Sequence, residues 1–528
     1  MQYGVFYYTI LNLQPSHQSC FANVHLLALC NSLDLKVHGY KPILERFVAE
    51  INGLQTVGFS GNFPVIGSQQ IYVGLAQVAC DNLALNGLFG FIECFSADYF
   101  CSICLATQND IQSQFRESDF CLRTHDSYEA DVVQAQMLPP GGHSHGVKSP
   151  CCLNEIVGFR VIENYVLDPM HILLEGVVPL ELGCVLFHLI SVKHYLSLSD
   201  LNTRMHCFFE KNSVDESNRP PTLNPLQRSS GLSPSMKAIQ MLALLKYLPL
   251  VIGINVDKED PHWHFLLSLC ELTDYLFAPK FTKGMIAFMR VLISEHLTDF
   301  RELYGSDSKL RPKHHLLLHL PTVILENGPL VTMSCLRYEM KNSFFKRSSA
   351  VVCNFVNICK SLAYRHQCNA FFLRMSKQYL RRCITVGTKG SECGPASNYR
   401  FCACMCESIC IASMQNVCVA TKISVSSVTY RKNYFFVVGV SDCGEPVFGE
   451  AEAFVSLPDC IEWHVVMHRV DTVAFRSHFH AYEVQRITPA EYICVPVSDL
   501  HDYHPLSPCP LQLGDGCRTF VRLPYHIF

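Results

Sequence analysis

Two short apolar runs near the start of the chain, residues 3–13 and 70–80, have the pattern of β-strands. Each is rich in apolar and aromatic residues and ends at polar or turn residues. Between them, apolar residues recur at helical spacing at Leu26, Leu29, Ile43, Phe47 and Ile51. The order strand, helix, strand predicts an α/β unit at the beginning of the chain.

The pattern changes twice further along the chain. After a loop at 139–142, the section 168–310 has helical spacing and predicts an all-α region, interrupted by a polar surface loop at 211–235. From residue 430 the period becomes that of strands, and turn signals separate the runs. These runs, 434–440, 446–455, 461–470 and 481–484, predict a small β-barrel or sandwich, joined to the helices by a linker rich in Gly, Ser and Thr at 384–400.

Composition narrows the class of protein. The chain has 528 residues, of which 49% are hydrophobic and 17% charged, and this predicts two to four folded domains without long disordered stretches. A net charge of −4 excludes a uniformly basic nucleic-acid coat protein but allows one basic face. The 28 cysteines follow no basic and apolar leader, so we expect reduced thiols in a cytosolic or nuclear protein. The apolar run 172–192 contains Glu175, Glu181 and His188, which favours a buried helix over a membrane span.

Cysteines and histidines provide one candidate metal site. Cys101-x-x-Cys104 has the spacing at which two thiolates reach one tetrahedral Zn²⁺. In His314-His315-x-x-x-His319, either His314 or His315 can pair with His319 within the usual spacing of histidine ligands. With so many cysteines and histidines in the chain, both patterns also arise by chance, and the alternative is a helix with histidines on its polar side.

Two carboxylates have positions suited to chemistry. Asp81 directly follows the run 71–80, where an α/β sheet delivers side chains to its carboxyl edge, although a turn aspartate beside Asn82 is the simpler interpretation. Glu339 lies between Arg337 and Lys341, where a glutamate in a helical salt bridge is the simpler interpretation. Asp168, followed by Pro169 and His171, has the pattern of a helix start, with Asp168 as N-cap.

Charge is concentrated in one stretch. Between Arg337 and Arg382 there are ten basic residues and one acid, Glu339, a local charge of +9. Aromatic residues are interleaved, so an amphipathic helix pair that buries the aromatics would turn its cations toward a polyanion. A solvated basic surface is the alternative. The candidate DNA-binding residues are Arg337, Lys341, Lys346, Arg347, Lys377, Arg381 and Arg382.

Taken in order, these pieces resemble transposases of the EnSpm/CACTA group. The resemblance is carried by CDNLALN at 80–86, YFCSIC at 99–104, DPMH at 168–171 with Glu175 and Gly176, PKHHLLLH at 312–319, RYEMK at 337–341 and HFHAYE at 478–483. It covers most of the chain, and the order and spacing of the motifs are more specific than any one of them.

The resemblance implies an RNase H-like core with a large all-α insertion before the last catalytic helix. Asp81 would be the second catalytic carboxylate and Glu339 the third, while Asp168 and His171 would support the active site. Cys101, Cys104, His314 and His319 would form a structural Zn²⁺ site, with His315 as the alternative to His314. Catalysis in this family would use two Mg²⁺ or Mn²⁺ ions to cut and join DNA.

One element of that pattern is missing. The first catalytic aspartate belongs on the opening strand of the core, but the acids before Asp81 are Asp34, Glu45 and Glu50, all in the predicted helical stretch. We therefore expect an incomplete core that lacks its first strand, and a nuclear protein that binds DNA without cutting it. The alternatives are an active transposase whose first strand lies upstream, and a Cys/His-rich regulatory protein that binds other proteins.

The expected domain organisation follows from these assignments. Residues 1–135 would form the first part of the core, 136–310 a linker and the all-α insertion, and 311–383 the last catalytic helices with the basic stretch. Residues 384–429 would be a linker and 430–528 the β-rich domain. DNA is the expected partner, with a homo-oligomer left open, and no membrane is expected.

Overall fold

The computed structural model describes residues 3–527, apart from 14–16, 18–19, 213, 226–235, 353–355, 377–383, 387–390, 426–427, 459 and 515. The chain is mixed α/β and forms two compact units, each built from two separate segments of sequence. Unit 1 comprises Met1–Val177 and Phe281–Leu380, and unit 2 comprises Val178–Lys280 and Arg381–Phe528. The expected all-α region 136–310 is therefore divided between the two units.

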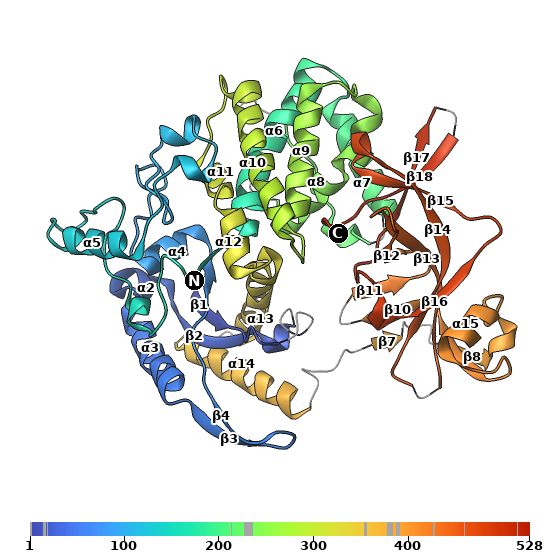
Figure 1. Cartoon of the computed structure of the whole chain (residues 1–528), viewed down its shortest axis with the longest axis horizontal. Coiled ribbons are helices and arrows are strands. Elements are labelled where there is room, and N and C mark those ends of the chain that lie inside the picture. The colour runs from blue at the N-terminus through green and yellow to red at the C-terminus, as the bar shows by residue number, and fades with distance from the viewer. Residues whose placement is uncertain are drawn as a thin grey trace. The chain divides into compact units, whose positions relative to one another are not determined.

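Unit 1 begins with an antiparallel pair of strands, β1 (Tyr3–Tyr8) and β2 (His25–Asn31). Helices α2 (Ser32–His38) and α3 (Lys41–Thr56) follow, and then the hairpin of β3 (Phe59–Phe63) and β4 (Gly67–Ile71) (Figure 1). The prediction that Leu26 and Leu29 belong to a helix is wrong. They lie on β2. The side chain of Leu26 packs against Phe345 and Leu362, which belong to two later helices of the unit.

The centre of unit 1 is a short parallel strand pair. It consists of β5 (Val78–Cys80) and β6 (Tyr165–Leu167), with Cys80 opposite Leu167. Helix α4 (Asn82–Phe89) follows β5, α5 (His125–Gln136) lies in the connection, and a π-helical segment, Met170–Val177, follows β6. The predicted strand 70–80 is thus two strands with a break between them.

The second segment of unit 1 is helical. It contains α10 (Lys283–Tyr304), α11 (Pro312–Leu317), α12 (Leu320–Asn327), α13 (Leu336–Val352) and α14 (Ile358–Met375). Helices α13 and α14 pack on the β1–β2 pair, and the Tyr7 hydroxyl donates to Asn342 Oδ1 at 2.7 Å.

Unit 2 begins with a helical segment, which is followed by β-strands. The helices are α6 (Val178–Phe187), α7 (Leu198–Lys211), α8 (Ala238–Ile252) and α9 (Pro261–Leu276). Met170–Val192 and Ala238–Asn255 are long and apolar enough to cross a membrane, but 72% and 67% of their apolar windows are buried inside the protein. This burial is typical of core helices, as the sequence predicts for 172–192.

The strands of unit 2 form a curled antiparallel sheet with the order β17-β18-β15-β14-β13-β9-β8, with β12 paired to β13 and β16 to β14. A smaller sheet has the order β11-β10-β7. The bounds are β7 (Ile384–Val386), β8 (Glu392–Pro395), β9 (Asn416–Ala420), β10 (Lys422–Val425), β11 (Val428–Arg431), β12 (Phe435–Val440), β13 (Pro446–Ser456), β14 (His464–Arg476), β15 (Ala481–Arg486), β16 (Tyr492–Pro496), β17 (Pro508–Leu513) and β18 (Gly516–Val521).

The predicted β-rich region is confirmed, and it begins earlier than expected. Residues 384–429, predicted as a linker, contribute β7 to β10, the start of β11 and the helix α15 (Cys402–Ile409). Within this segment Cys393 and Cys418 form a disulfide between β8 and β9, a departure from the expectation of reduced thiols. Gly, Ser and Thr between short strands give this segment the composition of a linker. The strands form because they pair with other strands of the folded chain, and a local sequence pattern does not show this pairing.

A buried ionic network holds α9 of unit 2 to its strands. Arg522 donates to Asp274 Oδ1 at 2.8 Å, and His480 Nε2 lies 2.9 Å from Asp274 Oδ2. Burial raises the pKa of Asp274, but the charge of Arg522 and the hydrogen bond from His480 outweigh it and bring the pKa to about 2. The carboxylate therefore stays ionised although it is largely shielded from water. Trp263 of the same helix is fully buried.

Candidate metal centre

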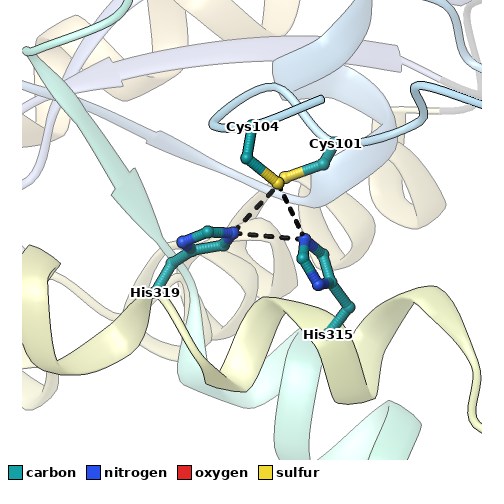
Figure 2. Close-up of side chains that lie close together, drawn as sticks. All are labelled: Cys101, Cys104, His315 and His319. Carbon is teal, nitrogen blue, oxygen red and sulfur yellow. Dashed lines mark hydrogen bonds between the residues drawn. The ribbon is translucent and has the colours of Figure 1, made fainter. Parts of the chain in front are cut away.

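Four side chains of unit 1 converge at one buried point. Cys101 and Cys104 come from the loop after α4, His315 from α11, and His319 from the residue that precedes α12 (Figure 2). All four are at most 2% exposed, and their donor atoms lie within 4.8 Å of one another. This Cys₂His₂ cluster joins segments more than 200 residues apart, since Cys101 and His319 are separated by 218 positions.

The donor atoms lie close to the spacing of a tetrahedral zinc site, with Cys104 and His315 somewhat closer together than a bound ion would hold them. Zn–N bonds of about 2.0 Å and Zn–S bonds of about 2.3 Å at tetrahedral angles require about 3.3 Å between nitrogens and about 3.5 Å between sulfur and nitrogen. His319 Nε2 lies 3.2 Å from His315 Nε2, Cys104 Sγ lies 3.1 Å from His315 Nε2, and Cys101 Sγ lies 3.7 Å from His319 Nε2. The donor set, two thiols and two imidazoles, is one that Zn²⁺ prefers, so the cluster could hold zinc.

Local electrostatics favour the metal-binding thiolate form of Cys101, whereas burial and the neighbouring Cys101 raise the pKa of Cys104. Burial raises the pKa of Cys101, but the hydrogen bond from Cys104 and the charge of His319 outweigh it and hold the pKa well below its usual value. Burial lowers the pKa of His319, yet Cys101 and Glu117 raise it to about 9. A thiolate is thus favoured beside a cation even before a metal ion supplies its own charge.

Neighbouring residues fix the ligands in place. His319 Nδ1 is 2.9 Å from Glu117 Oε1, and Thr322 and Arg290 donate to the other oxygen of that carboxylate. Such a carboxylate behind a ligating histidine sets the tautomer and the ring orientation. His315 is held differently, with edge-to-face ring contacts to Phe100 and Phe120.

The loop that carries the cysteines is held by a buried arginine. Arg123 donates to the Cys101 carbonyl through Nε at 3.2 Å and through Nη2 at 3.1 Å. Its Nη1 lies 3.6 Å from Asp131 of α5, and its backbone amide donates to the Ile103 carbonyl at 2.8 Å. Sequence reasoning missed Glu117, Arg123 and Asp131, because each lies outside the metal-ligand spacing and no local pattern marks it.

His315, not His314, completes the cluster. The ring of His314 lies against Phe300, and its Nδ1 accepts a hydrogen bond from the Arg311 amide at 3.1 Å. Of the two histidines that the sequence allows, the structure selects the one four residues before His319. Side chains four residues apart in helical turns lie on the same face, so His315 faces the same way as His319, whereas His314, five residues from His319, does not.

A second cluster of polar residues surrounds the carboxyl edge of β5 and β6. Asp81 follows β5 and Asp168 follows β6, so both aspartates lie at the same end of a parallel pair. After burial itself, Asp81 and Asp168 are the two groups that raise the pKa of the Cys80 thiol, which shows that both lie near it. Asp81 also caps α4, because its Oδ1 accepts from the Ala84 amide at 2.7 Å.

Asp168 is fully buried and its carboxylate is saturated with hydrogen bonds. It accepts from the Ser334 hydroxyl at 3.0 Å, from the Cys335 amide at 2.9 Å and from the His171 amide and ring. His171 Nε2 in turn lies 3.2 Å from Glu339 Oε1 on α13. Burial lowers the pKa of His171, but Asp168 and Glu339 raise it to about 10. Asp168 and His171 therefore hold Glu339 beside the end of the parallel strands.

The candidate DNA-binding residues fall into three groups. Lys346 and Arg347 are exposed on α13. Lys341 is not a surface cation, because it is buried and its ammonium donates to the Phe21 carbonyl at 2.6 Å, while the half-buried Arg337 stacks on Tyr338. Lys377, Arg381 and Arg382 lie outside the described residues.

The chain matches no protein-family model and none of the curated proteins with which it was compared.

Proposed function

We propose that this chain is a transposase-derived protein that binds DNA, built on an RNase H-like core. The observation that carries the proposal is the parallel pair β5–β6, with one aspartate directly after each strand. The carboxyl edge of parallel strands is where α/β sheets hold their ligands. Asp81 takes the position of the second catalytic acid in the EnSpm/CACTA pattern, and Asp168 and His171 take its supporting positions.

The path of the chain supports the same interpretation. After the π-helical segment that carries His171, residues 178–280 leave unit 1, and α10 returns to it. The cysteines of the cluster precede this excursion and its histidines follow it. Zinc bound there would cross-link the two sides of the interruption, as expected for an insertion in the core, and its role would be structural.

In the part of the chain that the structure describes, the carboxylates near these strand ends fall short of a two-metal site. Asp81 and Glu339 are accessible, whereas Asp168 is fully buried and committed to its hydrogen bonds. Among the described residues before Asp81, Asp34 lies on α2, and Glu45 and Glu50 lie on α3, so none of them ends a strand. Two-metal catalysis depends on carboxylates that bridge and flank both ions, so we propose binding without Mg²⁺- or Mn²⁺-dependent cleavage. With this role we propose a location in the nucleus.

Salt-dependent binding of duplex DNA by the full chain tests the proposal. Anisotropy titrations of a labelled duplex at several salt concentrations should show affinity falling steeply with salt, by about one power of salt per phosphate contact. Lys346→Glu combined with Arg347→Glu should lower this slope by about two, and Lys283→Glu on α10 is the matched control. Absent or salt-insensitive binding would contradict the proposal. Metal-dependent nicking that Glu339→Ala abolishes would replace it with an active transposase.

A further inference from the structure

The outer face of α14 exposes aromatic side chains that the sequence pattern predicts to be buried. Tyr364 is 71% exposed, Phe371 65% and Phe372 62%, and Met375 extends the stripe at 68%. Tyr364, Phe371 and Met375 are seven and four residues apart, so they lie on one line along the helix. The ring of Tyr364 precedes that of Phe371 by about 10 Å along the axis.

The opposite face of α14 is fully used. Ile358, Leu362, His366 and Ala370 are buried, and Ile358 and Leu362 belong to a core cluster with Leu26 of β2 and Phe345 of α13. The helix is therefore fixed on a sheet and does not need its outer aromatics for packing. Exposing three rings on an anchored helix is costly in water, and such a patch marks a binding surface.

Positive charge surrounds these rings. Lys360, Arg365 and Arg374 are exposed on α14, and α14 contains no acidic residue. Lys346 and Arg347 add two exposed cations on α13. Burial, and after it the charge of Lys341, lower the pKa of His366 to about 4, and His25 and Arg374 contribute to the same shift. The exposed face of α14 therefore carries cations and no carboxylate of its own.

We propose that the outer face of α14 binds single-stranded nucleic acid, with unpaired bases stacked on Tyr364, Phe371 and Phe372 and phosphates held by Lys360, Arg365 and Arg374. Aromatic rings interleaved with cations are how proteins bind single strands without reading their sequence. A duplex would use the cations but would leave the rings without a partner, because its bases are already stacked. This inference rests on the proposed function in taking DNA as the partner, and it adds that the strand is unpaired at this face.

The experiment compares two DNA probes of the same length on the full chain. The probes are a labelled oligothymidylate of about 15 nucleotides, close to one site size, and a labelled mixed-sequence duplex. Phe371→Ala combined with Phe372→Ala should weaken oligothymidylate binding by about 10-fold or more, because stacking on each ring is lost. Duplex affinity should change less than about threefold, since the phosphate contacts remain. Phe371→Tyr keeps the ring and should retain binding.

Matched controls separate this result from a loss of structure. Phe288→Ala removes an exposed phenylalanine from α10 of the same unit and should leave both affinities unchanged. Circular dichroism checks that the double variant is folded. Equal losses on the two DNA probes would overturn the inference. Phosphatidylserine vesicles serve as a third probe, which tests a membrane surface as the partner of this face. The inference would also be overturned if the double variant lost binding to these vesicles and kept its binding to oligothymidylate.

The two proposals fail in different ways. Duplex binding by the unaltered chain without oligothymidylate binding would overturn this inference and leave the proposed function standing. No binding to either probe would overturn both. Ring-dependent binding of the oligothymidylate alone would support this inference and remove the duplex-binding role.

Discussion

At the scale of single residues, the cluster depends on which side of a helix a histidine occupies. His314 and His315 are about 100° apart around α11, so only one of them can face the cysteines. The sequence predicted the two cysteines and His319 as ligands, and it left His314 and His315 as alternatives for the fourth ligand. It could not supply Glu117 or Arg123, because the contacts of these residues come from the folded chain and not from spacing.

The two neighbouring histidines provide a matched test of the metal centre. His315→Ala should lose about one equivalent of bound zinc, because it removes one of four ligands from a buried tetrahedral site. His314→Ala removes an equally buried ring and should keep its zinc. Elemental analysis of the purified variants measures both. Retention of zinc by the His315 variant, or its loss from the His314 variant, would contradict the assignment.

A second test at this scale concerns Asp274 of unit 2. Its pKa of about 2 lies below the unfolded value of 3.8, so its contribution to stability is present above about pH 4 and is lost as the pH falls toward 2. Asp274→Asn should therefore lower the free energy of unfolding at neutral pH by about 2 kcal/mol, with a smaller difference near pH 3. Urea unfolding followed by tryptophan fluorescence measures this, because Trp263 and Trp463, the two tryptophans of the chain, both lie in unit 2. Asp471→Asn, at an exposed position, is the control.

At the scale of elements, the sequence predicted those whose pattern is local. The helices of 168–310 and the four strands from β12 to β15 follow from periodicity alone. Strand β2 was missed because Leu26 and Leu29 fit a helical spacing, and only pairing with β1 makes the segment extended. The segment 384–429 was missed for the same reason, since β9 is a strand through its pairing with β13 and β8.

The end of α4 gives an element-scale prediction. Gly90 terminates this helix with a φ of +79°, and a Cβ atom there would lie 1.9 Å from the Ser149 carbonyl oxygen. Gly90→Ala should cost about 3 kcal/mol or more, because backbone strain adds to a clash with main chain that cannot move aside. Gly67→Ala is the matched control, since its φ is +71° with nothing within 4 Å. It should cost about 1 kcal/mol, and chemical unfolding followed by circular dichroism compares the two. Equal losses would show that the contact with Ser149 is unimportant.

At the scale of the whole molecule, the two units should respond differently to loss of the metal. Zinc at the cluster would cross-link the cysteine loop and α11, both in unit 1, and a strong zinc chelator would remove this cross-link. We expect proteolysis to begin in unit 1 while the tryptophan fluorescence of unit 2 keeps its folded spectrum. Limited proteolysis with mass spectrometry locates the first cleavages. Simultaneous unfolding of both units, or no change in either, would contradict this expectation.

The separation between the cysteines and the histidines has a further consequence for synthesis of the chain. Cys104 and His315 are 211 positions apart, so at about 5–20 residues per second the ribosome makes the thiols about 10–40 s before their partner imidazoles. During that interval all of residues 178–280 are produced, and they belong to the other unit. If the cluster binds zinc as proposed, the nascent chain must keep both thiols reduced and unpaired until α11 emerges, and metal insertion would be a late event in the biogenesis of this protein.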